Sequence, residues 1–250
     1  MYAKKVLFAT LNWGLGHTTR SIPIIKELQS RGYEIIIASD GIAGLVLQRE
    51  FPLLPYFELP SYQITYSPHS FYYHWIQQLP KLRQAISIEH KRIAEIVSSN
   101  QVDVVISDNR YGVYHPTTKN IFITHQLSFA LPFPINKLLS HQIRVMVNRF
   151  DQCWIPDYPT QDNLTGLLST GKIAIEKVFI GPISRFKPQE GERKFDLGVI
   201  ISGPEPLRTT LQNELLAKLD QTWKTFWVLG KPGANASNEA QNQYAHLNTD

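Results

Sequence analysis

The sequence has one cysteine, Cys153, among 250 residues, so no disulfide can form within the chain. Chains without disulfides are typical of reducing compartments, and we therefore expect the protein to be cytoplasmic. Long hydrophobic runs are also missing. The apolar run after Lys4 and Lys5 stops at Asn12, and no run approaches the ~20 apolar residues that a spanning helix needs. Any membrane contact is expected to be peripheral, at the inner face of the membrane.

The chain also lacks a strong charge of either sign. Twenty-five basic and 21 acidic residues give a net charge of +4 and a pI near 9.0, with 43% hydrophobic residues. This composition is that of a soluble globular protein. The small basic excess favours anionic partners, such as nucleotide sugars or acidic lipid surfaces, but it is too dispersed to indicate nucleic acid binding. No clear metal-binding cluster is present, so neither a metal nor another cofactor is expected.

The most informative stretch is an apolar strand, a glycine-rich loop and an amphipathic helix between Val6 and Arg20. Gly14 and Gly16 allow a sharp turn, and the helix that follows directs its free N–H groups and positive dipole end at the loop. Such a loop suits an anion or a polar ligand. His17 stands at its mouth, where an imidazole can accept a proton near neutral pH. A purely connecting loop, with the histidine capping the helix, is the alternative.

A dinucleotide site is a second alternative for this loop. Gly14 and Gly16 begin a G-x-G-x-x-G pattern, and Asp40 follows the next strand at a suitable distance for a ribose contact. Thr19, however, occupies the position of the third glycine. His17 would also crowd the pyrophosphate where the backbone must approach it, so nicotinamide binding is the less favoured interpretation.

Strand and helix patterns alternate through the first 183 residues. Strands are expected at 4–10, 33–39, 53–59, 102–107, 121–124, 151–157 and 178–182, with helices at 18–31, 42–50, 76–99 and after 135. This alternation predicts an α/β fold with a doubly wound parallel sheet. Ligands of such sheets collect at the carboxyl ends of strands where the strand order reverses, normally between the first and the fourth. That rule brings His17, Asp108 and His125 towards one crevice.

Two segments allow more than one interpretation. The aromatic stretch 60–75 could pack over the sheet or line an acceptor cleft. The helix after 135 carries Lys137, His141, Arg144 and Arg149 among apolar residues, so it could lie on an anionic membrane, although apolar stripes more often face a core.

Residues 184–194 are rich in proline, glycine, lysine and glutamate, as linkers are. We therefore expect a first domain at 1–183 and a second at 195–250, which opens with another strand, loop and helix. About 55 residues are few beside the ~100 to 150 of a usual domain. The second domain is thus expected to be truncated.

Four short segments carry a resemblance to a known family: residues 14–17 after the first strand, 107–110 after the fourth, 154–157 after the sixth, and 202–206 in the second half. With them the chain resembles the GT-B glycosyltransferases. It is similar to the group that includes the lipid-linked muramyl peptide N-acetylglucosaminyltransferases and their uncharacterised relatives. The resemblance implies a Rossmann-like domain that binds a glycan or lipid-linked acceptor, followed by the beginning of a Rossmann-like domain that binds a nucleotide sugar.

The resemblance also implies residue roles. His17 would be the general base for an acceptor hydroxyl in hexosyl or N-acetylhexosaminyl transfer, and Asp108 would orient it. Acceptor contacts would come from Gly14, Gly16, Thr18, Asn109, Arg110 and His125, and donor contacts from Ser202, Gly203, Glu205 and Arg208. The family's late donor signature has no counterpart here, so we expect poor donor binding by this chain. A nucleotide-sugar epimerase on the same fold and a non-catalytic phosphate- or glycan-binding module remain alternative functions.

Overall fold

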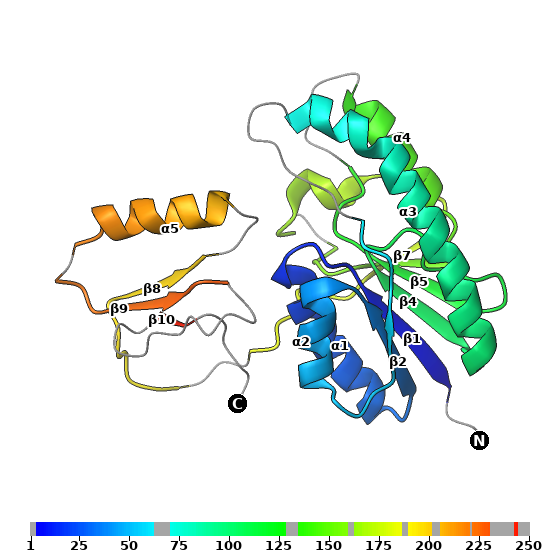
Figure 1. Ribbon diagram of the computed structural model, residues 1–250, viewed down its shortest axis with the longest axis horizontal. Helices are drawn as coiled ribbons and strands as arrows, with labels where there is room; N and C mark the ends of the chain where they lie inside the picture. The colour runs from blue at the N-terminus through cyan, green and yellow to red at the C-terminus, as the bar shows by residue number, and fades with distance from the viewer. Residues whose placement is uncertain are drawn as a thin grey trace. The chain divides into compact units, whose positions relative to one another are not determined.

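The computed structural model describes residues 4–62, 71–128, 135–159, 163–186, 190–201, 206–220, 222–230 and 243–244. The chain divides into two compact units, one of residues 1–12 and 17–184 and one of residues 13–16 and 185–250. Each unit contains its own parallel sheet (Figure 1). The expected mixed α/β class is therefore confirmed.

The sheet of the first unit has seven parallel strands in the order β3-β2-β1-β4-β5-β6-β7. They are β1 (Lys5–Thr10), β2 (Glu34–Ser39), β3 (Tyr56–Glu58), β4 (Val104–Asp108), β5 (Lys119–Ile123), β6 (Gln152–Ile155) and β7 (Glu176–Phe179). The order reverses between β1 and β4, as a doubly wound sheet requires. In the register of this pair, the last residue of β1, Thr10, lies opposite the last residue of β4, Asp108.

Helices cover both faces of this sheet (Figure 1). They are α1 (Leu15–Ser30), α2 (Gly41–Glu50), α3 (Phe71–Asn100) and α4 (Ile135–Val147), with a 3₁₀ turn at Gly166–Thr170. Alternate side chains of β1 point to opposite faces. Val6 and Phe8 pack in one layer with residues of α1 and α2, whereas Leu7 and Ala9 pack in another with residues of α3. The near-continuous hydrophobic pattern of β1 follows from burial on both sides.

Helix α1 starts at Leu15, three residues before the position that the sequence predicted. The chain turns at Gly14, which has a φ of +80°, a conformation that residues with a side chain rarely adopt. His17 therefore lies in the first turn of the helix rather than in the loop before it. The backbone of His17 is therefore held by the hydrogen bonds of a helix, which fixes the direction of its side chain more firmly than a loop would.

The second unit has a three-stranded parallel sheet in the order β10-β9-β8. Its elements are β8 (Leu197–Ile200), α5 (Leu207–Lys218), β9 (Thr225–Val228) and β10 (Gln243–Tyr244). Ile201, Trp227 and Leu229 form its buried core, against which Leu215 of α5 packs. The succession of β8, α5 and β9 is the start of a Rossmann-like unit.

Candidate active site

The candidate site lies where β1 and β4 end side by side. His17 projects from the first turn of α1, and Asp108 is the final residue of β4. Nδ1 of His17 is 2.8 Å from Oδ1 of Asp108, although 91 residues separate them in the sequence. The structure thus brings together the two residues that the sequence analysis proposed as a pair.

Asp108 is completely buried, and its carboxylate contacts the side chains of His17, Arg20 and Ser21. Arg20 donates from Nε to Oδ2 at 3.0 Å and from Nη2 to Oδ1, while the Ser21 hydroxyl donates to Oδ2 at 3.4 Å. Burial raises the pKa of the Asp108 carboxyl, but the charge of Arg20 and the contact with His17 outweigh it and lower the pKa to about 2. Asp108 is therefore ionised at neutral pH.

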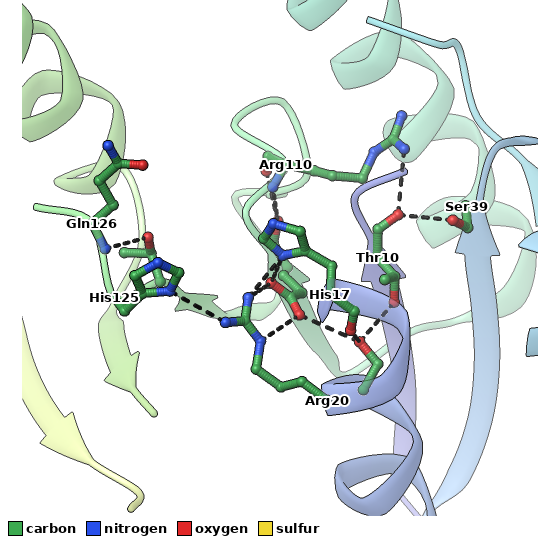
Figure 2. A network of polar contacts seen from close by, with 11 residues as sticks. Thr10, His17, Arg20, Ser39, Arg110, His125 and Gln126 are labelled. Atoms are coloured by element: carbon green, nitrogen blue, oxygen red, sulfur yellow. Dashed lines mark hydrogen bonds and ion pairs between the residues drawn. The ribbon is translucent and has the colours of Figure 1, made fainter. Parts of the chain in front are cut away.

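The sequence analysis gave no role to Arg20, which is the most connected side chain of the site. It lies three residues after His17, so both project from the same face of α1. Its guanidinium contacts Asp108, Nδ1 of His17 at 2.8 Å and Nδ1 of His125 at 3.4 Å (Figure 2). The three-residue spacing between His17 and Arg20 could have indicated that both lie on one face of a helix. That inference requires the helix to begin before His17.

Nδ1 of His17 faces both the carboxylate of Asp108 and the guanidinium of Arg20. Nδ1, Oδ1 of Asp108 and Nη2 of Arg20 all lie within 2.8 Å of one another. Such a triangle has corners of roughly 60°, whereas the two hydrogens on a guanidinium nitrogen diverge by about 120°. A single Nη2 hydrogen can point between Oδ1 of Asp108 and Nδ1 of His17, so Arg20 reaches both atoms. A proton on Nδ1 would be donated to Asp108 and would leave on Nε2 the lone pair that a general base requires.

His125 lies two residues beyond the end of β5 and completes this cluster (Figure 2). Burial lowers the pKa of His125 below its usual value of 6.5, and the positive charge of Arg20 lowers it further. The ring is therefore neutral at pH 7. Because Nδ1 of His125 faces the guanidinium of Arg20, its proton belongs on Nε2, where it is available as a hydrogen-bond donor.

The acceptor-binding role expected for Arg110 is wrong. Its side chain is completely buried, and it donates to Glu89 at 2.5 Å, to Asp40 at 2.5 Å and to the carbonyl of Pro60 at 2.6 Å. These partners belong to α3, to the start of α2 and to the segment after β3. Arg110 therefore binds the sheet to its helices and holds the turn after β4 in place. An acceptor substrate cannot contact its buried side chain.

The same network excludes the dinucleotide interpretation of the loop. Asp40 is 4% exposed and forms its ion pair with Arg110, so its carboxylate is not offered to a ribose. Its second contact is the side-chain amide of Asn12 at 3.3 Å. Asp40 is thus part of the buried framework beneath the loop.

Thr18 is also misassigned as an acceptor contact, because it is completely buried and a ligand cannot touch it. Gly14 and Gly16 are exposed, and an added Cβ at either would meet no described atom within 4 Å. Asn109 adopts a left-handed conformation with φ of +61°, and its buried Oδ1 has no hydrogen-bond partner in the part of the chain that the structure describes. Acceptor contacts from Gly14, Gly16 and Asn109 remain predictions.

The predicted donor contacts belong to the second unit. Ser202, Gly203 and Glu205 lie outside the described residues. Arg208 lies in the first turn of α5 and donates from Nη1 to the carbonyl of Gly230. Across the described ranges, no group of three or more His, Cys, Asp or Glu side chains could hold a metal ion.

Asp157 gives a structural reason for the motif at 154–157. Its buried carboxylate accepts backbone N–H groups of Tyr158 and Leu164 at 2.8 Å and of Thr165 at 3.0 Å, together with the Thr165 hydroxyl. Burial raises the pKa of the Asp157 carboxyl, but these donors outweigh it and lower the pKa to about 2. Asp157 therefore fixes the backbone on both sides of the loop that follows β6.

Comparison with known proteins identifies a related sequence and many related folds. No protein-family profile matches the chain. An uncharacterised glycosyltransferase of Methanosarcina mazei is 26% identical over 90% of this chain and 65% of its own length. The chain therefore spans less than two thirds of that relative.

Solved glycosyltransferase structures match nearly the whole chain. The calicheamicin glycosyltransferase CalG4 is 14% identical, with a TM-score of 0.57 over 98% of this chain and 70% of its own. The Phytolacca americana glycosyltransferase UGT2, complexed with UDP-2-fluoro-glucose and pterostilbene, is 16% identical. Its TM-score is 0.56, over 91% of this chain and 66% of its own. SsfS6 of Streptomyces sp. SF2575, complexed with thymidine diphosphate, is 15% identical. Its TM-score is 0.52, over 90% of this chain and 67% of its own. The chain therefore has the fold of the GT-B glycosyltransferases: a Rossmann-like parallel sheet followed by part of a second Rossmann-like unit.

Proposed function

We propose that the protein is a glycosyltransferase that moves a sugar from a nucleotide sugar to an acceptor hydroxyl, with His17 as the general base. The observation that carries this proposal is the 2.8 Å contact between His17 and the ionised Asp108 at the reversal point of the sheet. The fold and the similarity to the Methanosarcina mazei protein support the same reaction class.

The chemistry follows from the tautomer of His17. Nε2 takes the proton of the acceptor hydroxyl while the oxygen forms a bond to the anomeric carbon of the donor sugar. The bond from that carbon to the diphosphate breaks at the same time, and the nucleoside diphosphate leaves with the electron pair. Asp108 accepts the Nδ1 proton in a hydrogen bond throughout, so it fixes the ring and stabilises the imidazolium that forms. A single displacement of this kind inverts the anomeric configuration.

The other roles follow from the placement of each residue. Exposed Gly14 and Gly16, the half-buried Asn109 and the Nε2 hydrogen of His125 are the proposed contacts for a glycan or lipid-linked acceptor. Uridine and thymidine diphosphate groups are bound by the Phytolacca and Streptomyces proteins. We extend that chemistry to this protein and propose a nucleoside diphosphate sugar as its donor.

The test is a transfer assay on the full-length gene product. Uridine and thymidine diphosphate hexoses and N-acetylhexosamines are incubated with a panel of glycan and lipid-linked hydroxyl acceptors, and release of nucleoside diphosphate is measured. Release that depends on both substrates is the expected result. Interconversion of the donor sugar without an acceptor would identify an epimerase instead. Binding without turnover of any pair would favour a binding module.

A second proposal is peripheral contact with an anionic membrane through α4. No helix among the described residues is long and apolar enough to cross a membrane. Helix α4 nevertheless leaves Leu138 60% and Val145 46% exposed, next to Lys137 and Arg144. Such a face can insert apolar side chains while its cations meet lipid phosphates. Co-sedimentation with anionic vesicles, lost when Lys137 and Arg144 become glutamate, is the expected result, and unchanged binding would refute this proposal.

A further inference from the structure

Asp108 already has a permanent counter-ion in this structure. Arg20 contacts both carboxylate oxygens, with Nε on Oδ2 and Nη2 on Oδ1, and the side chain of Arg20 is only 13% exposed. Side-on contacts of this kind are strong and specific in geometry. The negative charge buried at the end of β4 is therefore balanced whether or not His17 carries a proton.

The charged and titratable groups that face His17 come from three elements. Asp108 lies at the end of β4, Arg20 on α1 and His125 after β5. Asp108 and Arg20 together carry no net charge, and His125 is neutral at pH 7 because burial lowers its pKa. A proton on His17 would therefore add a positive charge beside the guanidinium. In a pair without Arg20, the same proton would instead neutralise the buried carboxylate of Asp108.

We propose that Arg20 is a positioning residue that keeps His17 unprotonated, and thus able to act as a base, near neutral pH. This inference rests on the proposed function of His17. Arg20 acts through Asp108 and not on the substrate, because it balances the carboxylate that orients the imidazole. Without that balance, the carboxylate of Asp108 would favour a proton on His17, and an imidazolium has no lone pair with which to take a proton from an acceptor hydroxyl.

An arginine suits this task better than a lysine. A guanidinium places Nε and Nη2 in one plane to meet both carboxylate oxygens, and its third nitrogen still reaches Nδ1 of His125 at 3.4 Å. The ammonium group of a lysine would supply the same charge from one nitrogen, which cannot meet both carboxylate oxygens in this geometry. Lysine at position 20 is therefore expected to restore the charge balance without restoring the orientation of the ring.

The test is a pH titration of His17 by NMR in this chain, which requires no substrate. Arg20→Met is expected to raise the midpoint of the His17 titration by about one pH unit or more, since a nearby charge shifts a titration by that amount. Arg20→Lys should return it most of the way. Arg31→Met is the matched control, because Arg31 forms an exposed pair with Glu27 at the other end of the same helix. An unchanged or lowered midpoint in Arg20→Met would overturn the proposal.

A second variant decides the matter if Arg20→Met does not fold. Arg20→Gln keeps a polar side chain next to Asp108 but removes the positive charge, so the midpoint of His17 is expected to rise, and an unchanged or lowered midpoint would overturn the proposal. The pH profile of transfer by the full-length protein gives an independent readout, in which Arg20→Met should move the acidic limb to higher pH. If His17 proves dispensable for transfer, the proposed function fails while the NMR midpoints still decide the role of Arg20.

Discussion

Thr10 and Asp108 lie opposite each other in the parallel register of β1 and β4. This pairing places the chain that leaves β1 next to the carboxylate that ends β4, and the first turn of α1 then brings His17 to 2.8 Å from Asp108. The pair is therefore a product of strand order, because β1 and β4 are the neighbouring strands at which the order reverses.

Replacement of His17 by glutamine is expected to abolish most of the transfer activity of the full-length protein. Glutamine retains a polar side chain but cannot take a proton, and general base catalysis contributes roughly 10² to 10⁴ in rate. The measurement is kcat under saturating donor and acceptor, with circular dichroism to show that the fold is retained. His141→Gln, an exposed histidine on α4, is the control. Turnover within a factor of about three of the wild type would remove His17 from the mechanism.

Asp108 is expected to make stability depend on pH in acid. Its pKa is lowered from 3.8 to about 2 by Arg20 and His17 against the effect of burial, so the carboxylate favours the folded state when ionised. That contribution is fully present above pH 4 and is lost as the pH falls towards 2, and it is worth roughly 2 kcal/mol. Urea unfolding at a series of pH values should show a shallower acid dependence in Asp108→Asn. An identical dependence in both proteins would contradict this account.

Removal of Arg110 is expected to cost far more stability than removal of a surface arginine. Arg110→Met leaves Glu89 and Asp40 as buried carboxylates without their cation, and such a loss typically costs about 3 to 5 kcal/mol. Arg31→Met removes an exposed pair with Glu27 and should change the free energy of unfolding by less than about 1 kcal/mol. Urea denaturation compares the two variants. Similar losses in both would show that the buried network is not important for the fold.

Gly41 is expected to resist substitution because of its backbone and its neighbour. Its φ is +51°, and an added Cβ would lie 2.3 Å from the side-chain nitrogen of Asn12, which also contacts Asp40. Gly41→Ala should therefore lower the free energy of unfolding by about 1 to 3 kcal/mol. Gly191→Ala is the control, since no described atom lies within 4 Å of its added Cβ. Equal stabilities of the two variants would show that Asn12 moves aside without cost.

The sequence was sufficient to predict the sheet and the meeting of His17, Asp108 and His125. Apolar runs that alternate with amphipathic helices determine a parallel sheet, and the rule for strand reversal then locates the strand ends at which these residues meet. Neither step depends on the conformation of an individual side chain. This is why the prediction tolerated errors of several residues in the helix and strand boundaries.

Side-chain direction could not be predicted in the same way. Arg110 and Asn109 are adjacent in one turn, yet the guanidinium is buried in an ion-pair network while Asn109 is only half-buried. The start of α1 sets the direction of Thr18 and Arg20, so an error of three residues there concealed both the burial of Thr18 and the contact of Arg20 with Asp108. Strand β10 was missed because its polar sequence carries no strand pattern, and its pairing with β9 is a tertiary contact.

The most direct test of the proposed base is the tautomer of the neutral His17 ring. Nitrogen-15 NMR of the chain, with His17 assigned by its loss in His17→Gln, distinguishes a protonated ring nitrogen from one with a lone pair. The account predicts a proton on Nδ1, donated to Asp108, and a lone pair on Nε2. A proton on Nε2 would contradict it, because the ring would then have no lone pair on that nitrogen with which to deprotonate an acceptor.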